Sequence, residues 1–376
     1  WIQDKLKDVA DVRDGTHDSP KYLSAGIPLV TSKNVSNGQI NYDGVNYISL
    51  EDYKKINTRS KVDINDILMG MIGTIGNLAL IHTEPSFAIK NVALIKDTQQ
   101  IFYLFLYYYL QSPYITKQLF ISLDGGTQKF ISLKKIRNLF IRKTNSLEQK
   151  RVSYFFKSLD SIITLEQKKI EKLELLKEYL LQNMFADESG YPKVRFSGFT
   201  EEWIQDKGKN IFNKRNETSD QSYRKNIQLE NIESSTGRLI GNTSEGNESN
   251  SIFYKGDMLY GRLRPYLNKW WLASEDGNKS GEIWALYPIS RITNLFLYFL
   301  VQSFTFYKSA NISSGSRMPR ADWKIITNQY FNIPKPKEQE KISKFIHKLE
   351  AIITLEQTKL DNLSALKQKL LSSLFI

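Results

Sequence analysis

The chain contains one 38-residue segment twice, and this duplication limits its possible folds more than any other feature. Residues 148–185 align without a gap on residues 338–375, with 18 of 38 positions identical and a shared block IITLEQ. The similarity continues upstream, where LFLYYYLQS at 104–112 matches LFLYFLVQS at 295–303. The pentapeptide WIQDK occurs at 1–5 and again at 203–207. The chain is therefore a domain followed by a segment, present in two copies.

Both 38-residue segments are expected to be helices, since they contain no Pro or Gly and are rich in Leu, Ile, Lys and Glu. Apolar residues recur at spacings of three and four, as at Val152, Phe155, Leu159 and Ile162, which is typical of a coiled-coil seam. At 1.5 Å per residue, such a helix is about 57 Å long and must bury its seam against a partner. We expect the two helices to pair with each other in antiparallel directions, because parallel pairing requires a long return connection.

The segments outside these helices have mixed patterns. Short apolar runs, as at Ile27–Val30, Ile67–Met71 and Val92–Ile95, predict strands, whereas the 104–112 and 295–303 segments predict helices. The sequence therefore predicts an α+β fold with two tandem globular domains and an antiparallel coiled coil. The predicted boundaries are 1–147 for the first domain, 148–190 for its helix and linker, 191–337 for the second domain and 338–376 for its helix.

The net charge of +12 suggests a polyanionic partner such as nucleic acid, although an acidic membrane surface would attract the same charge. Residues 1–145 and 186–337 each carry a net +5, and the two helical segments each carry +1, so the surplus belongs equally to the two domains. No apolar run approaches the roughly 20 residues that span a bilayer. We therefore expect a soluble, cytoplasmic protein that does not bind membranes.

Enzyme motifs are missing from the sequence. There is no cysteine, which excludes disulfides and thiolate chemistry, and the three histidines lie far apart without an HExxH motif. No Walker A loop and no Asn-Pro-Pro-Tyr loop of adenine methyltransferases is present. We therefore expect no catalytic site, no metal site and no cofactor on this chain.

The duplicated plan resembles the specificity (S) subunits of type I restriction–modification systems. The resemblance rests on IPKPKEQEKI at 333–342, GDML at 256–259, VRFSGFTEEW at 194–203 and DGTHDSP at 14–20 with IPLVTSKNV at 27–35. The first copy departs from it, because IRKTNSL at 141–147 lacks the prolines. The resemblance also suggests that the natural protein has residues before Trp1.

The resemblance implies that each half reads one part of a split, asymmetric double-stranded DNA target. The helices would dock two modification subunits, which hold S-adenosylmethionine and methylate adenine, and restriction subunits would add ATP- and Mg-dependent cleavage. Three other interpretations stay open on the sequence alone: a stand-alone bivalent DNA-binding regulator, a coiled-coil adaptor and a cryptic enzyme.

Candidate DNA contacts follow from loop chemistry and from the repeat. Basic residues are dense in 129–143 without an acid among them, and Gly315-Ser316 precedes Arg317 as Gly126-Thr127 precedes Lys129. Arg262 and Arg264 replace Met71 and Gly73 of the first copy, and arginine gained in one copy suits base readout. The alternatives are a solvated basic face and a structural ion pair. The full set of candidates is Thr16, His17, Ser19, Lys33, Asn34, Thr127, Lys129, Lys134, Arg262, Arg264, Arg317 and Arg320.

Overall fold

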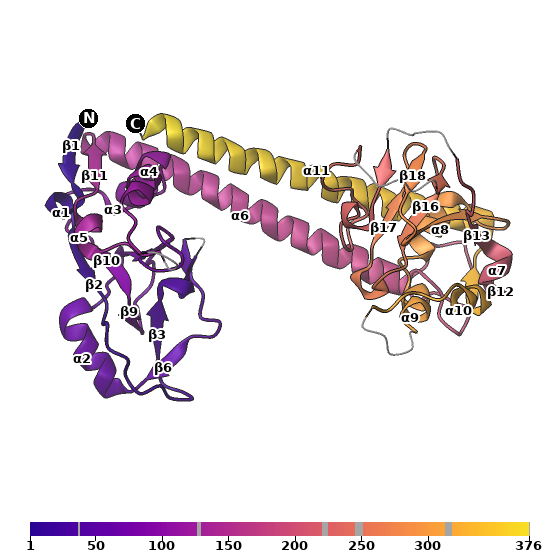
Figure 1. The fold of residues 1–376 in the computed structure, drawn as a ribbon, viewed down its shortest axis with the longest axis horizontal. Coiled ribbons are helices and arrows are strands. Elements are labelled where there is room, and N and C mark those ends of the chain that lie inside the picture. The colour runs from indigo at the N-terminus through magenta and orange to yellow at the C-terminus, as the bar shows by residue number, and fades with distance from the viewer. Residues whose placement is uncertain (37, 126–128, 220–224, 245–250, 313–317, 376) are drawn as a thin grey trace. The chain divides into compact units, whose positions relative to one another are not determined.

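A computed structural model describes the chain except for residues 37, 126–128, 220–224, 245–250, 313–317 and 376 (Figure 1). Its contacts define two compact units. Unit 1 comprises Trp1–Gln167 and Thr358–Ile376, and unit 2 comprises Lys168–Gln357. Each unit therefore contains one globular domain, part of the helix that follows this domain and part of the helix of the other copy.

A four-stranded antiparallel sheet forms the centre of the unit 1 domain. Its strands, in order across the sheet, are β2 (Asp11–Asp14), β10 (Val92–Lys96), β7 (Ile67–Gly70) and β8 (Leu78–Leu80). A second sheet has the order β6 (Asn46–Ile48), β3 (Ile27–Thr31) and β9 (Ala88–Lys90), with β3 parallel to β9. Two further pairs are β1 (Ile2–Lys5) with β11 (Phe140–Lys143) and β4 (Val35–Ser36) with β5 (Gln39–Ile40).

Short helices cover these sheets. They are α1 (Leu6–Val9), the 3₁₀ turn η1 (Ser32–Asn34), α2 (Leu50–Ser60), α3 (Tyr103–Leu110), α4 (Pro113–Ile121) and α5 (Leu133–Arg137). The aromatic helix α3 is buried almost along its whole length. The next helix, α4, starts where the sequence provides a cap, because the Ser112 hydroxyl accepts a bond from the Ile115 amide and Pro113 occupies the first turn.

Unit 2 repeats this scaffold. Its four-stranded sheet has the order β13 (Phe212–Lys214), β19 (Ile283–Pro288), β16 (Met258–Gly261) and β17 (Trp270–Leu272). The other strands are β12 (Ile204–Lys207) paired with β20 (Tyr330–Ile333), and the three-stranded sheet β14 (Asn226–Ile227), β18 (Gly277–Lys279) and β15 (Ile252–Phe253). The helices are α7 (Gly208–Ile211), η2 (Leu229–Asn231), η3 (Pro265–Leu267), α8 (Asn294–Leu300), α9 (Phe304–Ala310) and α10 (Trp323–Asn328). The predicted α+β class is therefore confirmed.

The register of the two central sheets fixes which residues are equivalent. Val92 of β10 lies opposite Gly70 of β7, and Ile283 of β19 lies opposite Gly261 of β16. The three-stranded sheets differ, because β3 is the central strand in unit 1, whereas β18 is central in unit 2. The copies thus share the central sheet and diverge in the smaller sheet beside it.

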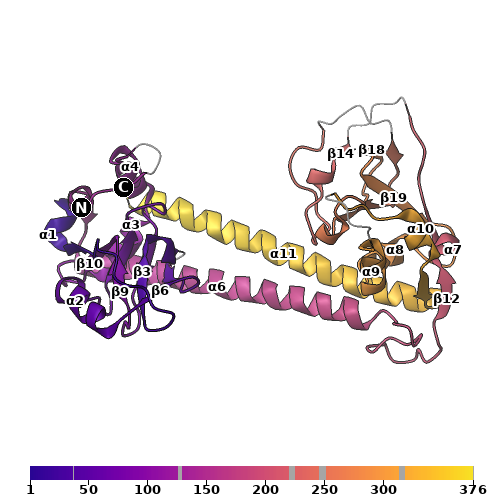
Figure 2. The same cartoon turned by 60° about the horizontal axis from the view of Figure 1, so that its bottom comes forward.

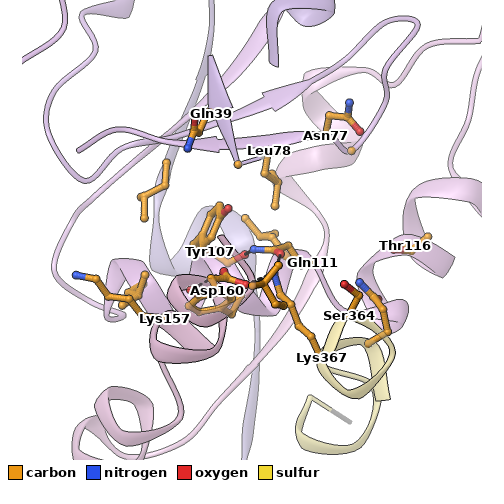
Figure 3. A pocket seen from close by; sticks show the side chains of 18 of the residues that line it. Gln39, Asn77, Leu78, Tyr107, Gln111, Thr116, Lys157, Asp160, Ser364 and Lys367 are labelled. Atoms are coloured by element: carbon orange, nitrogen blue, oxygen red, sulfur yellow. Dashed lines mark hydrogen bonds and ion pairs between the residues drawn. The ribbon is translucent and has the colours of Figure 1, made fainter. Parts of the chain in front are cut away.

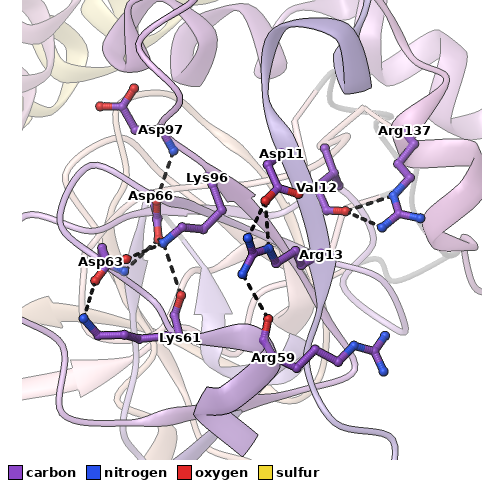
Figure 4. Close-up of polar contacts among 10 residues, drawn as sticks. All are labelled: Asp11, Val12, Arg13, Arg59, Lys61, Asp63, Asp66, Lys96, Asp97 and Arg137. Atoms are coloured by element: carbon purple, nitrogen blue, oxygen red, sulfur yellow. Dashed lines mark hydrogen bonds and ion pairs between the residues drawn. The ribbon is translucent and has the colours of Figure 1, made fainter.

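Ion pairs and backbone contacts occupy several basic side chains of the unit 1 domain (Figure 4). The Lys96 ammonium lies 2.6 Å from carboxylate oxygens of both Asp63 and Asp66, and its hydrogen bond lowers the pKa of Asp63. The Arg137 guanidinium, at the end of α5, donates to the carbonyl of Val12 at 2.7 and 2.9 Å. These cations hold the sheet together, so only part of the positive charge is available to a ligand.

The long helices are α6 (Ser146–Asn183) and α11 (Pro336–Leu374), which lie side by side in Figures 1 and 2. In unit 1, Phe156 from the start of α6 stacks on Phe375 after the end of α11, with ring centroids 5.6 Å apart. In unit 2, Lys177 near the end of α6 pairs with Glu350 of α11 at 2.5 Å. Opposite ends therefore meet within each unit, which confirms the predicted antiparallel pairing.

The predicted seam needs a correction. Phe155 and Ile162 are 50% and 45% exposed, whereas Phe156 is fully buried and faces the core. Polar side chains share the buried stripe, as Gln149 and Ser153 show at 5% and 0% exposure. Leu159, at 7% exposure, is buried as predicted, so the predicted seam is confirmed at Leu159 and wrong at Phe155 and Ile162.

Replacing Phe156 by Ala is expected to lower the free energy of unfolding by about 3–5 kcal/mol, because it removes a fully buried ring and leaves a cavity against Phe375. The matched control Phe155→Ala, on the exposed side of the same turn, should cost less than about 1 kcal/mol. Urea denaturation of the full chain measures both values. Equal losses for the two variants would contradict the seam described above.

Candidate nucleic-acid interface

Three loops of unit 1 meet at one end of the central sheet. The last residues of β2 and of β7 both lie beside the first residues of β10, as the pairs Asp14–Ala93 and Gly70–Val92 show. The loop after β2 runs against β9, because Thr16 donates its amide to the Ile89 carbonyl at 3.0 Å. A Cβ on the preceding Gly15 would lie 2.3 Å from that carbonyl oxygen, so only glycine permits this approach.

His17 projects from this loop and is held at both ring nitrogens. Its Nδ1 lies 2.8 Å from the Asn91 side-chain oxygen, and its Nε2 lies 2.8 Å from a carboxylate oxygen of Asp14. These hydrogen bonds, led by that to Asn91, raise the pKa of His17, since both favour the protonated ring. Asp14 is itself buried and paired with Arg59 of α2. His17 is therefore an exposed imidazole held at a fixed position.

Ser19 and Lys33 lie on neighbouring loops. The Lys90 ammonium donates to the Ser19 hydroxyl at 2.6 Å, which ties this loop to the end of β9. The Lys33 side chain is exposed on η1. The buried Ser32 fixes η1, because its hydroxyl donates to the Asn91 carbonyl at 2.7 Å and accepts from the Met71 amide at 2.9 Å.

Asn34, in the same turn, has a structural role. It is 2% exposed, and its side-chain oxygen accepts from the amide and hydroxyl of Thr31 at 3.0 and 2.8 Å. Its amide nitrogen donates to the Asn41 carbonyl at 3.0 Å. These bonds use the carboxamide at both ends, so the interface proposed below includes Lys33 but not Asn34.

Lys129 and Lys134 stand near the loop that follows β7. A bridge between Ile72 and Phe130 joins this loop to the Lys129 segment, where the Lys129 ammonium donates to the Gly125 carbonyl at 3.2 Å. Lys134 is exposed on α5. Thr127, also predicted from the sequence, lies outside the described residues.

In unit 2 the equivalent loops carry arginines around one carboxylate. Glu282 lies 3.2 Å from Nε of Arg262 and 2.7 Å from Nη2 of Arg320, so one acid holds two of the predicted arginines. The hydrogen bond from Arg320 is the main cause that lowers the pKa of Glu282. The backbone adds a bridge between Leu263 and Arg320, equivalent to the one between Ile72 and Phe130.

Arg264 differs from these two arginines. It has the left-handed φ of 50° and caps η3, while its amide donates to the Pro319 carbonyl at 2.7 Å. This conformation is uncommon for a residue with a side chain, and it turns an exposed guanidinium outward from the loop. Arg317, the remaining predicted arginine, lies outside the described residues.

Sequence reasoning missed the residues that organise these loops, namely Asn91, Glu282, Lys90 and Lys279. Lys279 is 5% exposed, and burial lowers its pKa to about 8, with further repulsion from Lys214 and Arg262. By strand register it occupies the position of Ile89, a core residue of unit 1. A lysine that replaces a core isoleucine in one copy could have been found by comparing the repeats.

Each unit also contains a cleft between its globular domain and its helices. In unit 1 the cleft measures about 1660 Å³, and Asp160, Gln111 and Lys367 lie together in its wall (Figure 3). The Lys367 ammonium lies 2.7 Å from Asp160 and 3.3 Å from the Gln111 side-chain oxygen. The unit 2 cleft, of about 700 Å³, repeats this set as Lys177, Glu350 and Gln302. The two clefts therefore share a set of polar residues, whereas the loops at the end of the sheet carry different residues in the two units.

Other classes of site find little support in the part of the chain that the structure describes. There, no three His, Asp or Glu side chains are grouped as a metal ion would require. Within the same residues, no helix combines the length and the apolar character needed to cross a membrane.

Two copies of one α+β scaffold, paired through antiparallel helices and carrying different polar side chains at the same end of the sheet, define a protein with two tandem, related domains. The family model of the type I restriction modification DNA specificity domain matches residues 1–175 and 182–365. The chain belongs to this family, which confirms the resemblance found in the sequence.

Individual relatives agree with this assignment. The type I restriction enzyme MjaVIII specificity subunit of Methanocaldococcus jannaschii is 28% identical over 205 residues, which cover 52% of this chain and 48% of that protein. The EcoBI specificity subunit of Escherichia coli is 28% identical over 175 residues, or 44% of this chain and 36% of that protein. The chain thus aligns with about half or less of the length of these relatives.

Solved structures share the fold over the whole chain. The S subunit of a type I restriction–modification system from M. genitalium gives a TM-score of 0.62 at 17% identity, covering 100% of this chain and 96% of that one. A chain from a structural study of the assembly and conformational transition of the type I R-M system gives the same TM-score at 15% identity, covering 99% and 96%.

The raised pKa of His17 predicts a pH-dependent contribution to stability. A group whose pKa is higher in the folded state stabilises the fold fully below its unfolded value of about 6.5, and this contribution disappears as pH rises through the folded value. His17→Gln should therefore destabilise the chain more at pH 5.5 than at pH 8.5, as urea denaturation at the two pH values would show. The control Ser24→Gln introduces the same residue at an exposed position that has no titrating side chain, and it should lack this difference. An equal loss at both pH values would show that the two ring contacts do not favour the protonated form.

Proposed function

We propose that this chain is the DNA-recognition subunit of a type I restriction–modification enzyme, in which each globular domain reads one half of a bipartite, asymmetric target. One observation carries this proposal: loops at the same end of the repeated sheet present His17 in unit 1, from the loop after β2, and three arginines in unit 2, from the loop after β16 and the segment that pairs with it. Bidentate arginine contacts select guanine, whereas a histidine on a polar loop suits a phosphate or a base edge. Two such surfaces would read two different half-sites.

The proposed interface combines the predicted residues that the structure leaves accessible. Asn34 is excluded because its side chain is buried and holds backbone positions. The interface residues are Thr16, His17, Ser19, Lys33, Lys129 and Lys134 in unit 1, and Arg262, Arg264 and Arg320 in unit 2. The equal net charge of the two domains supports a polyanion on both, because each surface would replace counterions on its own stretch of duplex.

The long helices would dock two modification subunits. Each unit exposes apolar residues at matching positions of α6 and α11. Exposed apolar surface of this kind is typical of a site that binds another protein. The set is Phe155, Ile162, Leu165 and Leu366 in unit 1, and Phe345, Ile352, Leu355 and Leu176 in unit 2. The paired exposures agree closely, for example 45% for Ile162 and 46% for Ile352. A surface present twice suits two copies of one partner.

The chemistry would belong to these partners. The modification subunits would hold S-adenosylmethionine and methylate adenine, and restriction subunits would bring ATP, Mg²⁺ and cleavage. This chain would direct both reactions in the cytoplasm without a catalytic group or a cofactor of its own. Its contribution is to place the partners on one DNA sequence.

A negative charge introduced into one of the two exposed apolar surfaces is expected to prevent the docking of one modification subunit and leave the other bound. Ile162→Asp should remove one modification subunit from the assembled complex, Ile352→Asp the other, and the double variant both, as native mass spectrometry would show. Both isoleucines are nearly half exposed, so the cost in folding should be small. The control Lys172→Asp adds an acid elsewhere on α6 and should leave assembly intact. Full assembly of the double variant would exclude this surface as the docking site.

Modified-base sequencing of genomic DNA tests the function as a whole. Cells with this gene and its partner genes should carry methylated adenine at a motif of two short blocks, and deletion of the gene should remove this methylation. Replacing residues 1–147 by the corresponding domain of another family member should change one block only. A chain that binds a single operator tightly without partners would instead be a stand-alone regulator, and one without DNA affinity would be an adaptor.

A further inference from the structure

The residue immediately before the β10/β19 strand occupies the same place in both units. Val92 lies opposite Gly70 and Ile283 lies opposite Gly261, so Asn91 and Glu282, which precede them, are equivalent. Both stand where the loops after the neighbouring strands meet. In unit 2 the Glu282 carbonyl also accepts the Arg262 amide at 2.9 Å, so this position connects two loops through its backbone as well.

The two residues contact different side chains. Asn91 has the left-handed φ of 53°, and its side-chain oxygen holds Nδ1 of His17 at 2.8 Å. Glu282 instead holds Arg262 at 3.2 Å and Arg320 at 2.7 Å. Each residue thus matches its neighbours chemically, as a neutral amide beside one imidazole and a carboxylate beside two guanidinium groups. The residue type and its contacts change together between the two copies.

We propose that Asn91 and Glu282 are positioning residues that orient the DNA-reading side chains of their own half and so determine which bases that half accepts. This inference rests on the proposed function. A free arginine side chain loses substantial rotamer entropy when it binds, and Glu282 fixes two of them before DNA arrives. The carboxylate also neutralises part of the charge of the two arginines, which disfavours binding to any phosphate backbone without the matching bases.

Arg264 provides a contrast within unit 2. Its backbone is fixed by the Pro319 carbonyl and by the bridge that joins Leu263 to Arg320, whereas the Glu282 carboxylate contacts the side chains of Arg262 and Arg320. Replacing Glu282 should therefore alter base preference at the positions read by Arg262 and Arg320. Contacts made by Arg264 should remain.

Selection from a randomised bipartite duplex library, using the full chain assembled with its modification subunits, tests this proposal. Glu282→Gln keeps the size of the side chain and removes its charge, and Asn91→Ala removes the contact with His17. Glu282→Gln is expected to reduce discrimination about tenfold at one or two positions of the block read by unit 2, and to leave the other block unchanged. Asn91→Ala should reduce discrimination in the block read by unit 1 and leave the block read by unit 2 unchanged. The control Glu275→Gln removes another exposed carboxylate of unit 2, paired with Lys225 at 3.3 Å, and should select the wild-type motif.

A double-variant comparison separates positioning from a general effect on folding. If Glu282 acts through its two arginines, Glu282→Gln should change nothing further in a chain that already carries Arg262→Ala and Arg320→Ala. An added loss in that background, or equal changes in both blocks, would overturn the proposal, as would an unchanged motif for Glu282→Gln. A wild-type complex that selects no bipartite motif would instead refute the proposed function itself.

Discussion

The antiparallel packing of α6 against α11 is the interaction on which the rest of the structure depends, because it completes the core of each globular domain. The main core of unit 1 includes Leu371 of α11 and Phe375 just after it, both from the second copy. The main core of unit 2 includes Leu180 of α6 and Met184 just after it, both from the first copy. Each domain therefore buries its apolar surface against residues that the other half of the sequence supplies. Separate halves would expose these surfaces.

This mutual dependence restricts where the repeats can diverge. The helices and the central sheets must keep their shape, since a change in either alters the packing of both copies. The loops at the end of the sheet carry no such constraint, and there the copies differ, with Asn91 and His17 in one and Glu282 and two arginines in the other. Lys279 in place of Ile89 shows divergence reaching the buried layer directly beneath those loops.

The sequence predicted the parts of the fold that depend on local pattern or on the repeat. The long helices, several strands and the antiparallel direction follow from spacing and connectivity, and the structure confirms them. The helix seam was wrong at Phe155 because buried polar residues such as Ser153 share the seam, and their hydrogen bonds are not visible in an apolar pattern. Likewise, Asn91 reaches His17, and Glu282 reaches its two arginines, only after the strands have paired. The spacing of these residues in the sequence does not show these contacts.

The sequence likewise predicted some residues of the candidate site and missed the contacts between them. Comparison of the repeats identified Arg262 and Arg264 as gains in one copy, but it could not show that Glu282 holds the first and not the second. The reason is physical, because ion pairs depend on distances of a few ångströms between segments that are distant in sequence. For the proposed function, Arg262 and Arg320 are oriented by Glu282 before DNA binds, whereas Arg264 is placed by the turn in which it lies. Under the proposed function, a scaffold of this kind would acquire a new half-site by changing a few loop residues together with the one residue that orients them, while the duplicated helix surfaces would continue to present the same contacts to each partner.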